Sequence, residues 1–168
     1  FTNMGKVYRI KGYEIPESSR ASRGTNIVNI LPLENGEKIT SVVKTSVLTD
    51  ESKYLVMVTR NGIVKRTEFN AYTNVRKSGL IAINLDEGDE LKWVKGTNGS
   101  NDIIISTSAG QAVRFNEDQV RAMGRAARGV RGMRLRPKDE VVGMDVVNDP
   151  SQKLLAISAN GYGKATAV

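Results

Sequence analysis

The sequence contains neither cysteine nor histidine. The lack of cysteine excludes disulfides, thiolate zinc sites and cysteine nucleophiles. The lack of histidine removes Ser-His-Asp triads, HExxH metal sites and the usual general base near neutral pH. Only an enzyme whose site is built from carboxylates and lysines stays open, and we keep it as one alternative.

Long apolar runs and aromatic side chains are also scarce. No apolar run approaches the roughly 20 residues that a membrane helix needs, and no secretory signal opens the sequence. We therefore expect no membrane partner. Aromatic residues make up 5% of the chain and do not interleave with the basic residues, which argues against recognition of single-stranded nucleic acid by base stacking.

Basic residues are in excess, and the excess is local. The chain holds 25 Lys and Arg against 18 Asp and Glu, a formal net charge of +7. The stretch from Arg121 to Lys138 holds seven basic residues and no acidic one. Such a concentrated patch favours an acidic partner over general solubilisation.

The sequence also repeats itself. Short apolar runs lead into segments that align without gaps, each with a glycine at the same position. The runs are "YLVMV" (54–58), "DIIIS" (102–106) and "LLAI" (154–157), and the segments are "TNMGKVYR" (2–9), "TRNGIVKR" (59–66), "TSAGQAVR" (107–114) and "SANGYGKA" (158–165). An apolar run, a turn with glycine and an alternating run predict a β-hairpin, because glycine supplies the positive φ that the turn needs.

A second glycine follows at a nearly constant interval and is followed in turn by two further expected strands. The second glycines are Gly24, Gly79 and Gly129; the strands after them are "TNIVNILPL" (25–33), "LIAINL" (80–85) and "VRGMRL" (130–135); the last strands of each unit are "ITSVV" (39–43), "LKWVK" (91–95) and "VVGMDVV" (141–147). Four strands at a period of about 50 residues predict an all-β, propeller-like array of four-stranded blades. A β-sandwich with coincident turn spacing is the alternative.

The predicted units are residues 1–53, 54–101, 102–153 and an incomplete 154–168. The first unit lacks the apolar strand that precedes the turn in later units, and the fourth stops just after its turn. Open blade edges would leave backbone groups unpaired. We therefore interpret the chain as a fragment of a longer protein.

Acidic and glycine-rich motifs carry weaker signals. "LDEGDEL" (85–91) and "RPKDEV" (136–141) place adjacent acids in a connection between strands, and "LENGEKI" (33–39) places two acids at the equivalent position, which is more typical of solvated turns than of a metal or catalytic site. "GRAARGVRG" (124–132) lacks the Lys-Ser/Thr ending of a phosphate loop. We predict no catalytic residue, no metal site and no bound cofactor in this chain.

The basic residues, in contrast, recur in phase with the repeat. One series lies four residues after the first glycine, and another lies in the loop before the second glycine. Arg9 belongs to the first series, and the predicted phosphate contacts are Arg20, Arg23, Arg66, Arg76, Lys77, Arg114, Arg121, Arg125, Arg128, Arg131 and Arg134. Equivalent positions on neighbouring blades would form one basic stripe.

Arginine in a loop of glycine, alanine and serine suits phosphate. Its fork makes bidentate contacts with phosphate, and small neighbours let a nucleic-acid backbone come close. We therefore predict a duplex bound through its phosphates, with little base readout. Arg125 and Arg128 are the strongest candidates, because on a regular strand over Val130–Leu135 the side chains of Arg131 and Arg134 would point to opposite faces.

Several of these motifs closely resemble the C-terminal domain of the bacterial DNA gyrase A subunit. They are "GIVKRTEFNAY" (62–72), "GLIAINLDEGDEL" (79–91), "VRAMGRAARGVRGMRL" (120–135) and "DEVVGMDVV" (139–147), and the resemblance covers essentially the whole chain. It implies a β-pinwheel, in which neighbouring blades exchange strands and DNA bends around a basic outer rim. This chain would hold about three blades and the start of a fourth.

The resemblance further implies a non-catalytic module of an ATP- and Mg²⁺-dependent, cytoplasmic, nucleoid-associated holoenzyme that supercoils DNA. Its other parts would be a second A subunit, together with the gyrase B subunit, in an A2B2 assembly. The family's Gln-Arg-Arg-Gly-Gly-Lys-Gly-like box, which belongs to the first blade, is missing here, and the loops present resemble those of later blades. A protein-interaction propeller and the equivalent domain of the topoisomerase IV A subunit remain alternatives.

Overall fold

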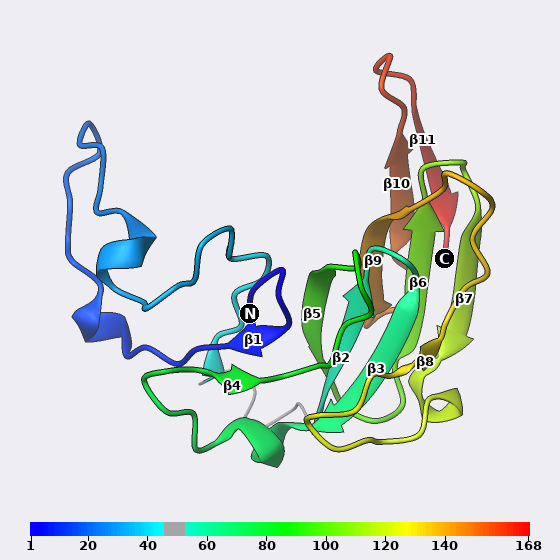
Figure 1. Ribbon diagram of the computed structural model, residues 1–168. Helices are drawn as coiled ribbons and strands as arrows, with labels where there is room; N and C mark the ends of the chain where they lie inside the picture. Colours follow the sequence, from blue (N-terminus) through cyan, green and yellow to red (C-terminus); the bar gives the residue numbers. More distant parts are fainter. Residues whose placement is uncertain (46–52) are drawn as a thin grey trace.

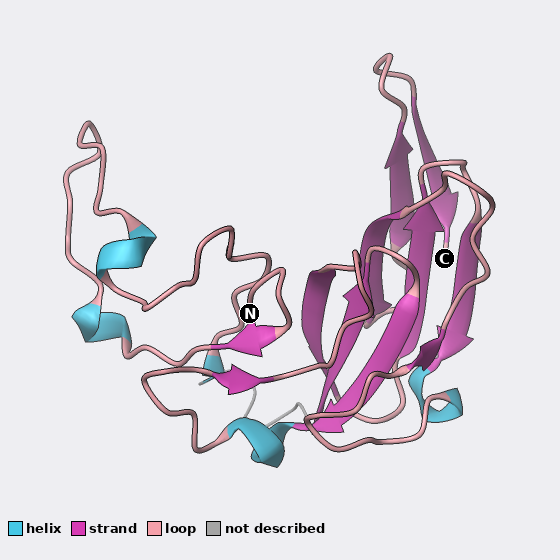
Figure 2. Cartoon of the chain, viewed as in Figure 1, coloured by secondary structure: helices cyan, strands magenta, loops and turns pink. Residues whose placement is uncertain are grey.

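Antiparallel hairpins form where an apolar run and a turn glycine occur together (Figure 1). The computed structural model describes residues 1–45 and 53–168. The strands are β1 (Lys6–Val7), β2 (Tyr54–Thr59), β3 (Ile63–Glu68), β4 (Leu80–Ile81), β5 (Leu91–Thr97), β6 (Asp102–Thr107), β7 (Ala112–Asn116), β8 (Val130–Arg131), β9 (Val141–Val147), β10 (Lys153–Ile157) and β11 (Gly163–Ala167). Short 3₁₀ turns are η1 (Gly12–Glu14), η2 (Ile27–Asn29), η3 (Phe69–Tyr72) and η4 (Glu117–Gln119). Figure 2 shows that strand and loop make up most of the chain, as the repeat predicts.

Neighbouring repeat units share sheets. One sheet has the order β5-β2-β3-β8, so that three strands come from the second unit and the fourth comes from the third unit. The first unit pairs with the second in the same way, through β1 and β4. A third sheet has the order β7-β6-β9, and β10 and β11 form a hairpin. This exchange confirms the predicted all-β array and the pinwheel arrangement.

Glycine carbonyls at the hairpin tips join each of the first two units to the next. The carbonyl of Gly5 accepts a hydrogen bond from the Ala82 N–H at 2.8 Å, and the carbonyl of Gly62 accepts one from the Gly132 N–H at 2.9 Å. Gly5 has a φ of 74°, and a Cβ on it would lie 2.5 Å from the carbonyl oxygen of Ile83. A side chain at this hairpin tip would therefore force the two units apart.

Two apolar cores lie on opposite faces of β2. Leu55 and Met57 face the first core, whereas Val56 and Val58 face the second. The first core comprises Val7, Leu55, Met57, Tyr72, Ala82, Ile83, Leu91 and Val94; the second comprises Val56, Val58, Val64, Ile103, Ile105, Val120, Val141, Met144 and Val146. The continuous apolar run 54–58 is thus a strand buried on both sides. Burial of each large apolar side chain contributes about 1.5–3 kcal/mol to the stability of the folded state.

Several expected strands are shorter than the sequence predicts. Residues 25–33 form a loop with η2, because no strand of the described residues pairs with them. Residues 80–85 and 130–135 pair as strands only over their first two residues. The next two N–H groups of each segment donate instead to a single glycine carbonyl, that of Gly5 or Gly62. Residues 39–43 keep one bridge, between Ile39 and Thr2.

The acidic turns hold the hairpin tips in place. The Asp89 carboxylate accepts a hydrogen bond from the Asn61 N–H at 3.0 Å, and Asp139 accepts one from the Ala109 N–H at 2.9 Å. Burial would raise the pKa of Glu37, but hydrogen bonds from Glu34, Thr2 and Tyr8 lower it. The turn interpretation is thus confirmed, although Asp89 and Glu37 are buried rather than solvated.

Lys138 provides a test of backbone strain. It has a φ of 65°, in a turn where the first two units have Gly36 and Gly88. A residue with a side chain in this left-handed conformation destabilises the folded state by roughly 1–2 kcal/mol relative to glycine. Glycine offsets part of that advantage, because it loses more conformational entropy on folding. We expect Lys138→Gly to raise the free energy of unfolding by about 0.5–1 kcal/mol in urea titrations. Gly88→Ala should lower it, and stabilisation by both changes would contradict this account.

Candidate nucleic-acid interface

The arginine-rich loop of the third unit lies against the second unit. This arginine loop, residues 121–129, runs from η4 to β8, and in Figure 1 it follows the lower side of the molecule beneath β3. The N–H of Met123 donates to the carbonyl of Arg66 at 2.8 Å. At the other end of the loop, β8 pairs with β3. Both ends of the loop are therefore anchored on the preceding unit.

Three successive carbonyls of the arginine loop are bound by donors of the second unit. The Nζ of Lys65 donates to the carbonyl of Arg125. The side-chain amide of Asn84 donates to the carbonyl of Ala126 at 2.6 Å, and the backbone N–H of Asn84 donates to the carbonyl of Ala127 at 3.3 Å. The oxygens of this segment are thus turned toward the protein.

The arginine side chains of the loop face solvent. Arg121 and Arg125 are exposed, and neither forms an ion pair within the described part of the chain. Arg128 is also exposed and pairs with Asp86. Asp86 therefore orients the Arg128 guanidinium without burying it. An exposed ion pair of this kind contributes little to the stability of the fold.

Arg131 and Arg134 are both exposed. The expected division of these two side chains between opposite faces assumed a regular strand, and that assumption is wrong. The strand β8 ends at Arg131, and beyond it Met133 and Leu135 pack against the second core. The alternation of faces is therefore interrupted between Arg131 and Met133, so that Arg131 and Arg134 are both exposed.

The corresponding loops of the other units also present basic residues. Arg76 and Lys77 are exposed in the connection between η3 and β4, the counterpart of the arginine loop in the second unit. Arg20 and Arg23 are exposed in the long loop between β1 and β2. None of these four forms an ion pair with another described residue.

The arginines four residues after the first glycine mainly make structural contacts. Arg9 donates to the carbonyl of Thr73 in the next unit at 2.6 Å. Arg66 is buried, lies 3.7 Å from a Glu117 oxygen and stacks on the Tyr54 ring. Arg66 must therefore be removed from the predicted phosphate contacts, because burial and these partners leave it no access to a ligand. Arg114 is 43% exposed and pairs with Asp102 at 2.7 Å.

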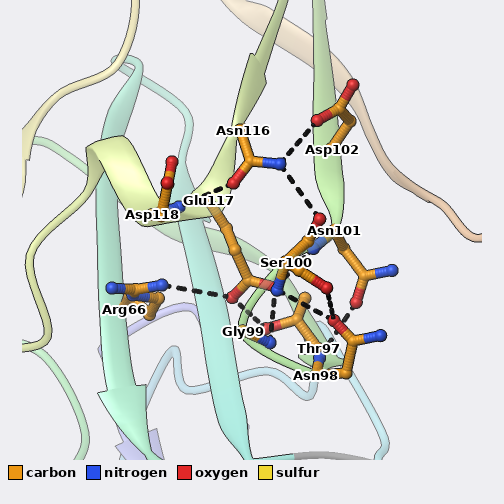
Figure 3. Close-up of polar contacts among 10 residues, drawn as sticks. All are labelled: Arg66, Thr97, Asn98, Gly99, Ser100, Asn101, Asp102, Asn116, Glu117 and Asp118. Carbon is orange, nitrogen blue, oxygen red and sulfur yellow. Dashed lines mark hydrogen bonds and ion pairs between the residues drawn. The ribbon is translucent and has the colours of Figure 1, made fainter.

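A buried carboxylate, Glu117, joins the second and third units (Figure 3). It accepts hydrogen bonds from the Thr97 hydroxyl at 2.6 Å and from the N–H groups of Gly99 and Asn101 at 2.9 Å each. The Arg66 guanidinium supplies the opposing charge. All of these groups become unsatisfied if the carboxylate is removed.

We expect Glu117→Ala to lower the free energy of unfolding by about 3 kcal/mol or more, since it leaves the largely buried Arg66 unpaired. Asp118→Ala is the matched control: its side chain is exposed and its loss should change stability by less than about 0.5 kcal/mol. Chemical denaturation of both variants measures the difference. Equal effects would show that the Glu117 network contributes nothing specific.

Lys65 is fully buried beneath the arginine loop. Its Nζ donates to the carbonyl of Ala82 at 2.6 Å as well as to Arg125. Burial lowers the pKa of Lys65 from 10.5 to about 8. Tyr72, which also donates to the Ala82 carbonyl at 3.1 Å, has its pKa raised to about 12 by burial.

These pKa values predict an unusual alkaline stabilisation. Between pH 8 and 10, Lys65 is protonated in the unfolded chain and increasingly neutral in the folded one, so stability rises with pH. The slope cannot exceed about 1.4 kcal/mol per pH unit. Above pH 10, the raised pKa of Tyr72 reverses the trend, because the unfolded tyrosine loses its proton first. Urea titrations at pH 8, 9 and 10 measure the rise, which Lys65→Met should abolish.

Sequence reasoning missed the residues that support the loop. The repeat assigns no role to Lys65, Asn84, Asp86 and Glu117: Lys65 aligns with the exposed Lys164 of the fourth unit, and Asp86 and Glu117 have no identical counterpart in another unit. The acids that bind the hairpin tips do recur with the repeat, because Glu37, Asp89 and Asp139 each follow a leucine by four residues.

Other classes of site find no support in the described residues. Residues 1–45 and 53–168 contain no group of three or more Asp or Glu side chains placed to hold a metal ion. Within the same ranges no helix is long and apolar enough to cross a membrane. A groove between β9 and β10 contains a single carboxylate, that of Asp145, rather than a pair.

Comparisons with known proteins agree on one family. The family described as DNA gyrase C-terminal domain, beta-propeller, matches residues 1–46, 53–98 and 101–148. The DNA gyrase A subunit of Staphylococcus epidermidis (strain ATCC 12228 / FDA PCI 1200) is 46% identical over 169 residues, which cover 100% of this chain and 19% of the relative. The DNA gyrase A subunit of Haloquadratum walsbyi is 45% identical over 172 residues, covering 100% and 20%. The chain thus spans about a fifth of these relatives.

Two solved structures share the fold and more than a quarter of the sequence. The C-terminal domain of DNA topoisomerase IV superposes with a TM-score of 0.88 at 31% identity and covers 100% of this chain and 52% of that one. A DNA gyrase A C-terminal domain superposes with a TM-score of 0.79 at 32% identity, covering 98% and 52%. The repeat units are thus arranged as in these two domains.

Proposed function

Because the chain belongs to the DNA gyrase C-terminal domain family, we propose that it binds duplex DNA through its phosphates and bends it. The arginine loop is the observation that carries this proposal. It presents Arg121, Arg125 and Arg128 to solvent while its carbonyls from Arg125 to Ala127 are turned inward. A phosphate approaching the loop would meet guanidinium groups rather than carbonyl oxygens.

The repeat extends this surface from one unit to the next. Arg76 and Lys77 occupy the counterpart loop of the second unit, and Arg20 and Arg23 that of the first. A duplex that contacts successive loops is held at several points along its length, and contacts distributed over a curved array favour bending. Recognition through phosphates carries no sequence information, so the binding should tolerate any duplex.

The proposed biological context is the larger A chain of a DNA gyrase. There this non-catalytic module would support ATP-dependent negative supercoiling by a holoenzyme that also contains a second A chain together with the gyrase B subunit, in the bacterial cytoplasm and nucleoid. ATP and Mg²⁺ would act in other domains, because the described residues offer no cluster of acidic ligands for a metal ion. This chain would contribute the bent duplex on which the strand-passing domains act.

A topoisomerase IV subunit is the second candidate, supported by the TM-score of 0.88 with the C-terminal domain of that enzyme. Ligation of nicked circular DNA in the presence of the chain separates wrapping from simple binding. A positive shift in linking number supports the gyrase-like role. Binding without any shift favours the alternative.

We expect DNA affinity to fall steeply with salt, because each neutralised phosphate adds roughly −0.9 to the log–log slope. Replacing Arg125 and Arg128 by alanine should weaken binding and reduce the slope by about 1.8. The matched control replaces Lys92 and Lys95, which lie on β5 and pair with Glu90 and Asp145. Anisotropy titrations with two unrelated duplexes from about 50 to about 200 mM salt measure both slopes.

Two outcomes would contradict the proposal. If the chain fails to bind duplex at low salt, the protein-interaction propeller becomes the better hypothesis. If the arginine variant and the lysine control show the same reduction in the salt dependence of DNA affinity, binding reflects net charge rather than the arginine loop.

A further inference from the structure

Lys65 has a role that neither the fold nor a phosphate contact explains. Its side chain is fully buried on β3, where its cross-strand partner is Met57. Within the described residues it has no carboxylate partner. Burying a lysine without a counter-ion is costly, so its retention needs a compensating interaction.

The repeat shows that the strand itself does not require lysine. The position three residues after the first glycine is Tyr8 in the first unit, Val113 in the third and Lys164 in the fourth, and Lys164 is exposed. The third unit forms its hairpin strand, β7, with the neutral Val113 there. An apolar side chain at position 65 would also match the neighbouring first core. Only in the second unit is a lysine at this position buried, so the buried lysine serves a contact particular to that unit.

That contact spans two units. The Nζ of Lys65 donates to the Ala82 carbonyl in its own unit and to the Arg125 carbonyl in the arginine loop, 60 residues away in the chain. Asn84 continues the same row of donors to Ala126 and Ala127. Lys65 thus lies under the first of three loop carbonyls, directly beneath one of the proposed phosphate contacts.

The charged groups around Lys65 are few. Tyr72, on η3, shares the Ala82 carbonyl with it. The positive charge of Arg125 partly offsets the rise in the pKa of Tyr72 that burial causes. The Arg125 side chain itself is exposed. Among the described residues no charged partner competes with the two carbonyls for the Lys65 ammonium group, which is therefore available to hold the loop.

We propose that Lys65 is a positioning residue, whose buried ammonium group holds the arginine loop of the following unit so that Arg125 and Arg128 face the DNA. This role rests on the proposed binding of duplex DNA. Lys65 itself touches no phosphate. It acts by keeping the carbonyl oxygens of the loop away from the DNA and by restricting the loop to one conformation before binding.

Lys65→Met tests the role, with Lys92→Met as a control that removes the same charge from a partly exposed position on β5. The first measurement is amide exchange of Ala127, whose N–H donates to Gly124 within the loop at 3.1 Å. We expect faster exchange in Lys65→Met only. The second is duplex affinity, expected to fall about tenfold, as when one charge-assisted contact is lost.

A background without the loop arginines separates positioning from general damage. In a chain with Arg125 and Arg128 replaced by alanine, Lys65→Met should cause little further loss of affinity, because it acts through those residues. An undiminished tenfold loss would overturn the proposal. So would normal loop exchange and normal DNA affinity in Lys65→Met, and in that case wild-type binding would still support the proposed function.

A failure of the wild-type chain to bind duplex refutes both the proposed function and the DNA-positioning role of Lys65. If Lys65→Met does not fold, Asn84→Ala takes its place, since this side chain is exposed and serves the adjacent carbonyl. Weaker binding with faster loop exchange supports the proposal. Unchanged binding and exchange overturn it, because the row of carbonyls would then need no donors.

Discussion

The carbonyls of Gly5 and Gly62 accept amide hydrogen bonds from the following unit, and the arrangement of the array depends on this contact. At Gly5 the next unit comes so close that a Cβ would lie 2.5 Å from the Ile83 carbonyl oxygen, and at Gly62 a Cβ would lie 3.2 Å from that of Met133. Asp89 accepts a hydrogen bond from the Gly62 tip, at Asn61, and Asp139 accepts one from the hairpin tip of the third unit, at Ala109. Once these tips are fixed, β4 and β8 can add to the sheets of the preceding units, and the two apolar cores close between them.

This contact also determines where the basic loops lie. Because β8 belongs to the sheet of the second unit, the loop that leads to it must cross the same boundary. The second unit provides the donors to the loop carbonyls, Lys65 and Asn84, while the third unit provides the exposed arginines. The proposed DNA surface is therefore composite: one unit presents the charge and its neighbour determines the conformation.

Most of the hairpin framework could be predicted from the sequence, since the turn glycines and apolar runs recur with the repeat and act locally. The extent of the strand after each second glycine could not, because it depends on carbonyls of another unit. Arg66 shows the same limit. It occupies the repeat position of Arg114, yet the nearby Glu117 and Tyr54 draw it into the interior. Burial of a charge depends on partners distant in sequence, which periodicity does not reveal.

The exchange of β8 means that the inherited repeat and the physical blade are out of phase by one strand. A chimera joined at the sequence boundary near residue 101 would place the arginine loop of one protein on the Lys65 and Asn84 of another. Compatible recombination would have to transfer a loop together with its support. Duplicated repeats in such arrays are therefore expected to diverge in pairs rather than singly, with the side chains beneath a loop changing together with those it displays.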